Sequence, residues 1–260
     1  MRIACIDIGN TKARLGLFVD GALEAVHRVA SAELPGAAVD KVARWGVRGV
    51  AFCSVVPSAN APLKDGLAHV GLPSMELGAR TCIGLAITYP KPAEIGPDRL
   101  ANAIGAQYLG KLPAVVLDVG TATTFDVVSA GSGYLGGVIA PGLDVLAGYL
   151  HERTALLPRI EPAEITGFEP TSYIGKSTRE AMKIGCKAGF AGMIANILDH
   201  LRAELRATEA APPRIIVTGG ATGAFGPELP AAWHHEPDIT LLGLAEALRR
   251  NYRKGRTRFG

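Results

Sequence analysis

The sequence of 260 residues lacks several patterns that would place a chain in a class at once. Its 4 cysteines form no CxxC pair and stand near no histidine partner, which argues against a zinc site and against a disulfide framework. No run of about 18 apolar residues is present to span a bilayer. The chain opens on a strand rather than on the basic and apolar segments of a signal peptide. We therefore expect a cytoplasmic protein with no membrane partner.

An excess of charge of one sign is also missing. The formal net charge is only +3, which does not by itself indicate a nucleic-acid partner, and we expect none. Basic residues gather in the final stretch RRNYRKGRTRFG, for which a solvated tail is the first interpretation and nucleic-acid contact a lesser alternative. The 32 glycines and 17 prolines follow no period, which excludes a collagen-like or low-complexity chain.

The sequence does contain a repeated pattern of strand, acid, glycine and hydroxyl. RIACIDIGNTKARLGLF (residues 2–18) places Asp7 and Gly9 directly behind a buried strand, and AVVLDVGTATTFDVV (residues 114–128) does the same with Asp118 and Gly120. A tight turn between strands presents backbone N–H groups, and glycine lets a phosphate approach them closely. Either acid alone could simply cap a turn. Two copies in register favour a shared nucleotide-binding plan.

Hydroxyl and lysine side chains extend this interpretation. Thr11 and Thr123 are candidate hydroxyl donors to phosphate, and Lys12 is a candidate positive charge, although it could equally be an ordinary exposed strand residue. Asp7 is suited to hold Mg²⁺ through water, because Mg²⁺ favours few carboxylates and several waters. TGGATG (residues 218–223) is a third candidate loop, for the nucleoside end. The chain has neither a Walker A sequence nor a GxGxxG fingerprint.

Strands and helices follow the two turns in the same order, which predicts a duplicated α/β domain. The predicted boundary lies near residue 110 and gives domains 1–110 and 111–260. An Asp20-Gly21 pair predicts a hairpin turn. Later segments predict a helix over 143–157, a long helix or a broken pair over 177–205 with a Ser177 and Glu180 capping box, and a final helix capped by Asp238.

The stretch TYPKPAEIGPDRLANAIGA (residues 88–106) contains a candidate proton acceptor, which the phosphate turns lack. Asp98 and Arg99 stand in the first turn of a predicted helix. An aspartate there ordinarily complements the helix dipole, whereas an arginine faces the unfavourable end. The alternative is an Asp–Arg pair that accepts a proton from a substrate hydroxyl and binds an anionic group. The residues alone leave these two interpretations even.

With these pieces in place, the sequence resembles the type III pantothenate kinases. The matching motifs are DIGNT, GPDR, DVGTATTFD, GGVIAPG, HERTALLPRI, GKST and VTGG, in family order over nearly the whole chain. The resemblance implies an α/β, actin-like fold of two duplicated ribonuclease H-like domains with mixed sheets flanked by helices. It also implies ATP-dependent phosphorylation of pantothenate, the first step of coenzyme A synthesis.

The resemblance implies a set of site residues as well. Asp98 is the expected proton acceptor and Asp118 the expected ligand of a monovalent cation, K⁺ or NH₄⁺; Mg²⁺ completes the expected cofactors. The expected ATP contacts are Asp7, Ile8, Gly9, Asn10, Thr11, Lys12, Ala13, Arg14 and Thr121. The expected pantothenate contacts are Tyr89, Gly96, Pro97, Asp98, Arg99 and Thr178. A homodimer with the substrate pocket near the subunit interface is also implied.

Two positions depart from the family pattern as we expect it. Ile184 stands where a small polar residue is expected, and Lys91 stands where asparagine is more usual. We interpret Ile184 as a helix packing residue. Two other functions remain open: a nucleotide-binding regulatory protein of the same fold without kinase activity, and a kinase for another small hydroxylated substrate.

Overall fold

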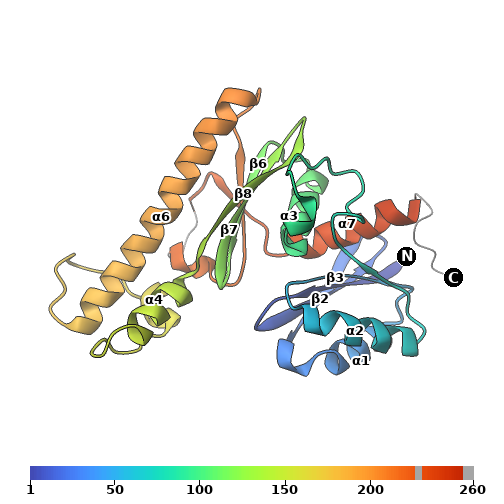
Figure 1. The fold of residues 1–260 in the computed structure, drawn as a ribbon, viewed down its shortest axis with the longest axis horizontal. Helices are drawn as coiled ribbons and strands as arrows, with labels where there is room; N and C mark the ends of the chain where they lie inside the picture. The colour runs from blue at the N-terminus through green and yellow to red at the C-terminus, as the bar shows by residue number, and fades with distance from the viewer. Residues whose placement is uncertain (226–229, 254–260) are drawn as a thin grey trace. The chain divides into compact units, whose positions relative to one another are not determined.

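The computed structural model describes residues 1–225 and 230–253, which form two compact units (Figure 1). Of these residues, unit 1 takes Met1–Lys111, Ser132–Tyr134 and 238–253, and unit 2 takes Leu112–Gly131, 135–225 and 230–237. The first change of unit falls one residue after the predicted boundary. The C-terminal helix differs from the prediction, because it packs in unit 1 although residues 111–260 were expected to form one domain.

Unit 1 contains a five-stranded sheet in the order β3-β2-β1-β4-β5. Strands β1 (Arg2–Ile8), β2 (Lys12–Val19) and β3 (Ala22–Ala30) pair antiparallel, and β4 (Val50–Ser54) and β5 (Ser74–Glu76) continue the sheet in parallel. The predicted hairpin is confirmed. Asp20 and Gly21 have φ of 51° and 92°, and a type I′ turn needs positive φ at both central residues.

The two faces of this sheet are covered by different helices. Helices α1 (Gly36–Arg44) and α2 (Pro57–His69) cover one face, over a core that includes Ile6, Leu15 and Phe52. Helices α3 (Pro97–Tyr108) and α7 (Ile239–Arg253) pack on each other and against β1 and β4. Because successive side chains of a strand point to opposite faces, Asp7 and Cys53 lie on the second face. Short 3₁₀ turns occur at Ser31–Glu33 and Pro92–Glu94.

Unit 2 repeats the plan of unit 1. Its sheet has the order β10-β9-β6-β7-β8, which is the order of unit 1 started from the other edge. Strands β6 (Ala114–Val119) and β7 (Ala122–Ser129) are antiparallel, β8 (Gly133–Pro141) lies beside β7, and β9 (Arg214–Thr218) and β10 (Trp233–His235) continue in parallel. The duplicated α/β plan predicted from the two acid–glycine turns is therefore confirmed.

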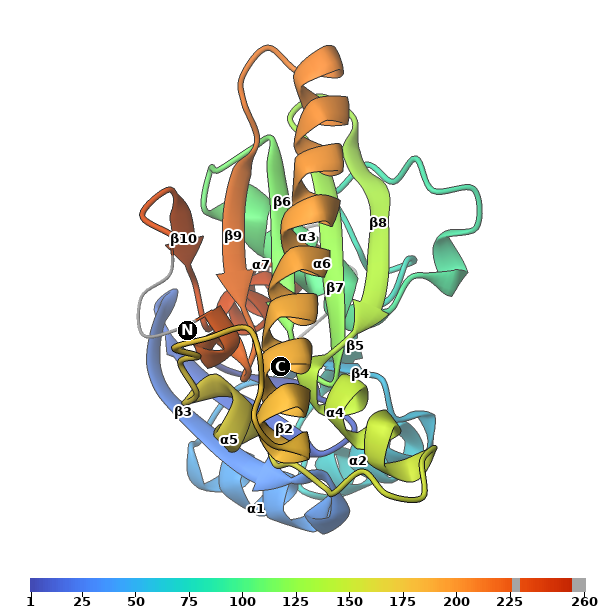
Figure 2. The same cartoon turned by 90° about the vertical axis from the view of Figure 1, so that its left-hand side faces the viewer.

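The helices of unit 2 lie together on one face of its sheet. They are α4 (Leu143–Glu152), α5 (Pro162–Thr166) and α6 (Thr178–Thr208), with a 3₁₀ turn at Thr222–Phe225. Figure 2 shows α6 lying along the sheet, where Phe190, Ile194 and Leu198 are buried with side chains of β6, β7 and β9. The single helix of 31 residues decides between the two alternatives for residues 177–205.

The predicted helix ends are confirmed in part. The Ser177 hydroxyl accepts the backbone N–H of Glu180 at 3.2 Å, but the Glu180 carboxylate accepts the N–H of Lys176 rather than that of Ser177. Helix α4 ends at Glu152, five residues before the predicted end. There the Thr154 hydroxyl donates to the carbonyl of Leu150, which closes the helix. Within the described ranges, no helix has the length and apolar character needed to cross a membrane.

Candidate functional site

The first phosphate turn joins β1 to β2 and is held by backbone bonds. The N–H of Gly9 donates to the carbonyl of Lys12 at 3.1 Å, and the hydroxyl of Ser31 donates to the carbonyl of Gly9 at 2.7 Å. Asn10, Thr11 and Lys12 are exposed at the tip. The turn therefore presents an amide, a hydroxyl and a positive charge on a braced backbone, which suits an anionic ligand.

The flanking residues of this turn have other environments. Ile8 and Ala13 are buried in the core of unit 1, so only their backbone is available to a ligand. Arg14 lies in β2 and forms an ion pair with Asp238, which immediately precedes α7. Asp238 was expected to cap α7; its backbone carbonyl accepts the N–H of Leu242, while its carboxylate is engaged with Arg14. The charge of Arg14 is thus partly balanced inside the protein.

Asp7 has a neighbour that the sequence pattern did not reveal. In the register of β1 and β4 it pairs with Cys53, whose Sγ donates to Oδ1 of Asp7 at 3.4 Å. Burial raises the pKa of the Cys53 thiol far above its usual range, and the negative charges of Asp7 and Asp98 raise it further. The two carboxylates that were 91 positions apart in sequence thus both act on one buried thiol.

Asp98 occupies the first turn of α3 in a conformation that depends on glycine. Its Oδ1 accepts the backbone N–H of Arg99 at 2.9 Å. A Cβ added to Gly96 would lie 2.5 Å from that oxygen, so glycine leaves the space that the carboxylate occupies. Burial raises the pKa of Asp98, and the N–H and the charge of Arg99 oppose this shift without cancelling it. The GPDR motif therefore builds a carboxylate with raised proton affinity.

Arg99 in turn lies over the ring of Tyr134, with 5.9 Å between the guanidinium carbon and the ring centroid. Tyr134 is fully buried and groups with unit 1. The sequence does not single out Tyr134, because nothing in its local pattern distinguishes it from a core tyrosine. Of the other expected substrate contacts, Pro97 is the first residue of α3 and Tyr89 is half-buried in the preceding loop. Lys91 is exposed and pairs with Glu94.

The second turn, in unit 2, brings together several oxygen atoms around two glycines. A Cβ at Gly219 would lie 2.4 Å from the carbonyl oxygen of Val119 and 2.6 Å from Oδ1 of Asp118. A Cβ at Gly142 would lie 2.1 Å from the carbonyl oxygen of Gly120. These glycines let three chain segments converge on the end of β6. Asp118 is thus a carboxylate at the point where these segments meet, close to backbone carbonyl oxygens.

The hydroxyls of this turn are in different environments. Thr121 is exposed, as a ligand contact requires. Thr123 is fully buried in β7, so its expected role as a phosphate donor at the turn surface is not supported. The turn is also one residue shorter than its counterpart, since Val119 pairs with Thr123 whereas Ile8 pairs with Ala13.

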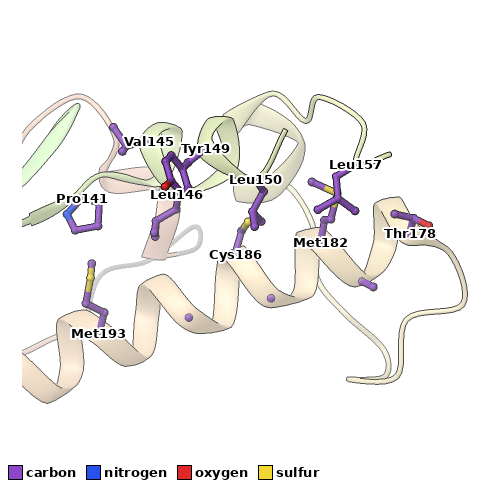
Figure 3. A pocket seen from close by; sticks show the side chains of 13 residues that line it. Pro141, Val145, Leu146, Tyr149, Leu150, Leu157, Thr178, Met182, Cys186 and Met193 are labelled. Atoms are coloured by element: carbon purple, nitrogen blue, oxygen red, sulfur yellow. The ribbon is translucent and has the colours of Figure 1, made fainter. Parts of the chain in front are cut away.

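A cavity of about 830 Å³ lies between α4 and α6 of unit 2 (Figure 3). Leu146, Leu150 and Leu157 face Met182 and Cys186 across it. Thr178, the first residue of α6, is exposed at the end of this groove. Ile184 is buried in α6, which confirms that it is a packing residue. Among the described residues, no group of three or more His, Cys, Asp or Glu side chains is arranged as a metal site.

Comparisons with known proteins agree on one family. The family model described as type III pantothenate kinase matches residues 3–200. A type III pantothenate kinase of Akkermansia muciniphila is 40% identical over 250 residues, which cover 94% of this chain and 97% of the relative. Its counterpart in Moorella thermoacetica is 34% identical over 261 residues, which cover 96% and 99%.

Solved structures show the fold. A ROK hexokinase from Thermus thermophilus has a TM-score of 0.57 at 16% identity, with 98% of this chain and 100% of that chain covered. A ROK family glucokinase from Streptomyces griseus, in complex with glucose and AMPPNP, has a TM-score of 0.54 at 16% identity, with 95% and 98% covered. Together with the repeated strand order, these confirm the expected actin-like fold of two ribonuclease H-like halves.

Proposed function

The chain belongs to the type III pantothenate kinase family, and from this premise we propose that it phosphorylates pantothenate with ATP, using Asp98 as the proton acceptor. The product is 4′-phosphopantothenate, and the reaction is the first step of coenzyme A synthesis. The oxygen of the substrate hydroxyl attacks the γ-phosphorus, the bond from that phosphorus to ADP breaks, and the hydroxyl proton passes to Asp98.

The environment of Asp98 is the observation that carries this proposal. A carboxylate is a better proton acceptor near neutral pH when its pKa is raised, and burial raises the pKa of Asp98. The N–H of Arg99 fixes Oδ1, which leaves the second oxygen of the carboxylate to meet a hydroxyl. An aspartate that only capped α3 would be most stable with its charged carboxylate exposed to water, so the burial of Asp98 favours a catalytic role.

For ATP we propose the turn at residues 7–14 and Thr121. Donors to phosphate come from the backbone and side chains of Gly9, Asn10, Thr11 and Lys12. Ile8 and Ala13 are buried and offer only their backbone, and the guanidinium of Arg14 is held in place by its ion pair with Asp238. Phosphoryl transfer asks a protein mainly for positioning and for neutralisation of charge. A braced turn with exposed donors meets both requirements.

Two cations complete the proposal. Asp7 fits Mg²⁺ held through water, because it is a half-buried carboxylate at the end of β1 and Mg²⁺ favours few carboxylates and several waters. Asp118, with the carbonyl oxygens that approach Gly142 and Gly219, fits K⁺ or NH₄⁺. When bound, such cations supply positive charge against the phosphate oxygens.

For pantothenate we propose contacts with Tyr89, with Gly96, Pro97 and Arg99 of the motif, and with Thr178. The guanidinium of Arg99 is the expected partner of the substrate carboxylate, since arginine binds carboxylates through paired N–H groups. The proposal places the enzyme in the cytoplasm, where ATP and the later steps of coenzyme A synthesis are available.

We further propose a homodimer formed through the α4–α6 groove. Val145, Tyr149 and Leu150 line this groove yet are 43%, 56% and 36% exposed. An exposed apolar patch of this kind marks an interaction surface. Gly185 and Gly189 add no side chains on the α6 side, so another chain can approach closely. Thr178 at the end of the groove would then lie at the subunit interface.

The test is a coupled assay of ADP release. Turnover is expected only when pantothenate, ATP, Mg²⁺ and K⁺ are present together, and Asp98→Asn should reduce it by on the order of a hundredfold or more. Asp65→Asn, at an exposed position of α2, is the matched control and should keep full activity. Purified protein that binds ATP but never consumes it with pantothenate would favour the regulatory alternative. Turnover with another small hydroxylated compound but not with pantothenate would favour a kinase for that other substrate.

A further inference from the structure

The first residues of β8 are hydrogen-bonded to the loop that carries expected substrate residues. The N–H of Tyr134 donates to the carbonyl of Ala86 at 2.8 Å, and the carbonyl of Tyr134 accepts the N–H of Thr88 at 3.1 Å and its hydroxyl at 3.2 Å. Tyr134 and Ile87 thus form an isolated parallel bridge. The loop is held one residue before Tyr89.

Only glycine at position 133 permits this close contact between the backbones. Gly133 has φ of 75°, and a Cβ there would lie 2.2 Å from the carbonyl oxygen of Ala86. Ser132, Gly133 and Tyr134 group with unit 1, although the residues on both sides of them belong to unit 2. Three consecutive residues between two segments of unit 2 thus belong to unit 1, and they include the ring of Tyr134.

That ring lies beneath the guanidinium of Arg99, 5.9 Å from ring centroid to guanidinium carbon. The ring is fully buried, so the guanidinium meets its face away from water, where a cation–π contact is strongest. A long flexible arginine ordinarily loses rotamer freedom when it binds a carboxylate. A guanidinium already held over a fixed ring has lost part of that freedom beforehand.

We propose that Tyr134 is a positioning residue for Arg99, and that its ring sets the preference of the enzyme for a substrate that carries a carboxylate. This inference rests on the proposed function, because it takes pantothenate as the substrate. Tyr134 does not touch the reacting atoms. It acts through the guanidinium, so its effect is confined to the step in which the carboxylate is bound.

The experiment compares Tyr134→Phe, which keeps the aromatic face, with Tyr134→Leu, which removes it at similar apolar character. Each enzyme is assayed with pantothenate and with its neutral alcohol analogue, in which a hydroxymethyl group replaces the carboxylate. In Tyr134→Leu the KM for pantothenate should rise by about three- to thirty-fold, the range that a cation–π contact provides. The KM for ATP and the kcat/KM for the alcohol should stay unchanged. Tyr134→Phe should behave as the unsubstituted enzyme does.

A second measurement covers the case in which Tyr134→Leu fails to fold. Phenylalanines with one, two or three ring fluorines, incorporated at position 134, keep the shape but progressively weaken the negative ring face. The KM for pantothenate should rise with each fluorine, while thermal stability changes little. A merely structural tyrosine would not produce this graded effect.

The outcomes separate the two proposals. If the unsubstituted enzyme does not phosphorylate pantothenate, the proposed function is overturned, and this inference falls with it. If it does, but the fluorine series is flat, only the role of Tyr134 is overturned. Equal losses with pantothenate and with the alcohol would also overturn that role.

Discussion

The backbone N–H of Arg99 donates to Oδ1 of Asp98 at 2.9 Å, so the residue expected to bind the substrate anion also orients the expected proton acceptor. Its charge lowers the pKa of Asp98, while burial raises it and prevails. The two neighbours are therefore coupled both by geometry and by charge. This coupling can be measured in stability and in pH dependence.

Asp98→Asn should stabilise the fold at neutral pH while it lowers turnover by on the order of a hundredfold or more. Because the pKa of Asp98 is higher in the folded chain than in the unfolded chain, the fold gains stability as pH falls through the raised pKa, and the ionised carboxylate costs stability above it. The amide keeps an acceptor for the N–H of Arg99 without the buried charge. The melting temperature should rise by a few degrees, since about 1 kcal/mol moves it by about 2–4 °C in a chain of this size.

That stabilisation should be absent from Asp65→Asn, which removes the same charge from an exposed position. The gain should also shrink at acid pH, where Asp98 is already protonated. A melting temperature that falls at neutral pH in Asp98→Asn would contradict the assignment of burial as the main cause.

The pH profile of kcat/KM for pantothenate should show an acid limb above the ordinary range of aspartate. Activity requires ionised Asp98, so it falls as pH drops through the raised pKa. Arg99→Gln should move this limb to higher pH, because the substitution removes a charge that lowers the pKa. Arg99→Lys keeps the charge and should keep the limb. Identical limbs in both variants would assign the limb to another group.

Asp118→Asn should lose the response to a monovalent cation. The carboxylate supplies a charged oxygen at the end of β6, and without it the nearby carbonyl oxygens hold a cation weakly. Turnover should fall by roughly a hundredfold and become insensitive to K⁺. The comparison is Asp144→Asn, at an exposed position in the first turn of α4. A variant at Asp118 that K⁺ still activates would place the cation elsewhere.

Gly189→Arg should convert the proposed dimer to a monomer. A Cβ at Gly189 meets nothing within 4 Å in its own chain, and the position lines the apolar groove. The larger, charged side chain is therefore tolerated within a protomer but excluded from a covered surface. Arginine also favours the helix over glycine by up to about 1 kcal/mol, so the monomer should not be destabilised.

The measurement is the molar mass by light scattering after size-exclusion chromatography. Gly36→Arg introduces the same charge in α1, where an added Cβ also has no atom within 4 Å. This control should still have the molar mass of a dimer. If Gly189→Arg keeps that mass too, the α4–α6 groove is not the interface.

The sequence by itself determined the duplicated succession of strands along the chain and the positions of the acids. Strands, glycine turns and helix caps depend on neighbouring residues, so the repeated acid–glycine turns and the N-cap at Ser177 could be read locally. The end of α4 was missed because local hydrogen bonds of the Thr154 hydroxyl, to the carbonyl of Leu150 and from the N–H of Leu157, replace the helix where the apolar period continues. The interpretation of Ile184 as a helix packing residue agrees with its burial.

Only the tertiary structure decided what surrounds those acids. Cys53 lies 46 positions from Asp7, Tyr134 lies 35 from Arg99, and Asp238 lies 224 from Arg14. Parallel strand pairing and the return of α7 to unit 1 bring such distant residues together, and no local pattern encodes which of them meet. The burial that raises the pKa of Asp98 is a property of this packing. The sequence therefore specified the acid, and the fold specified its proton affinity.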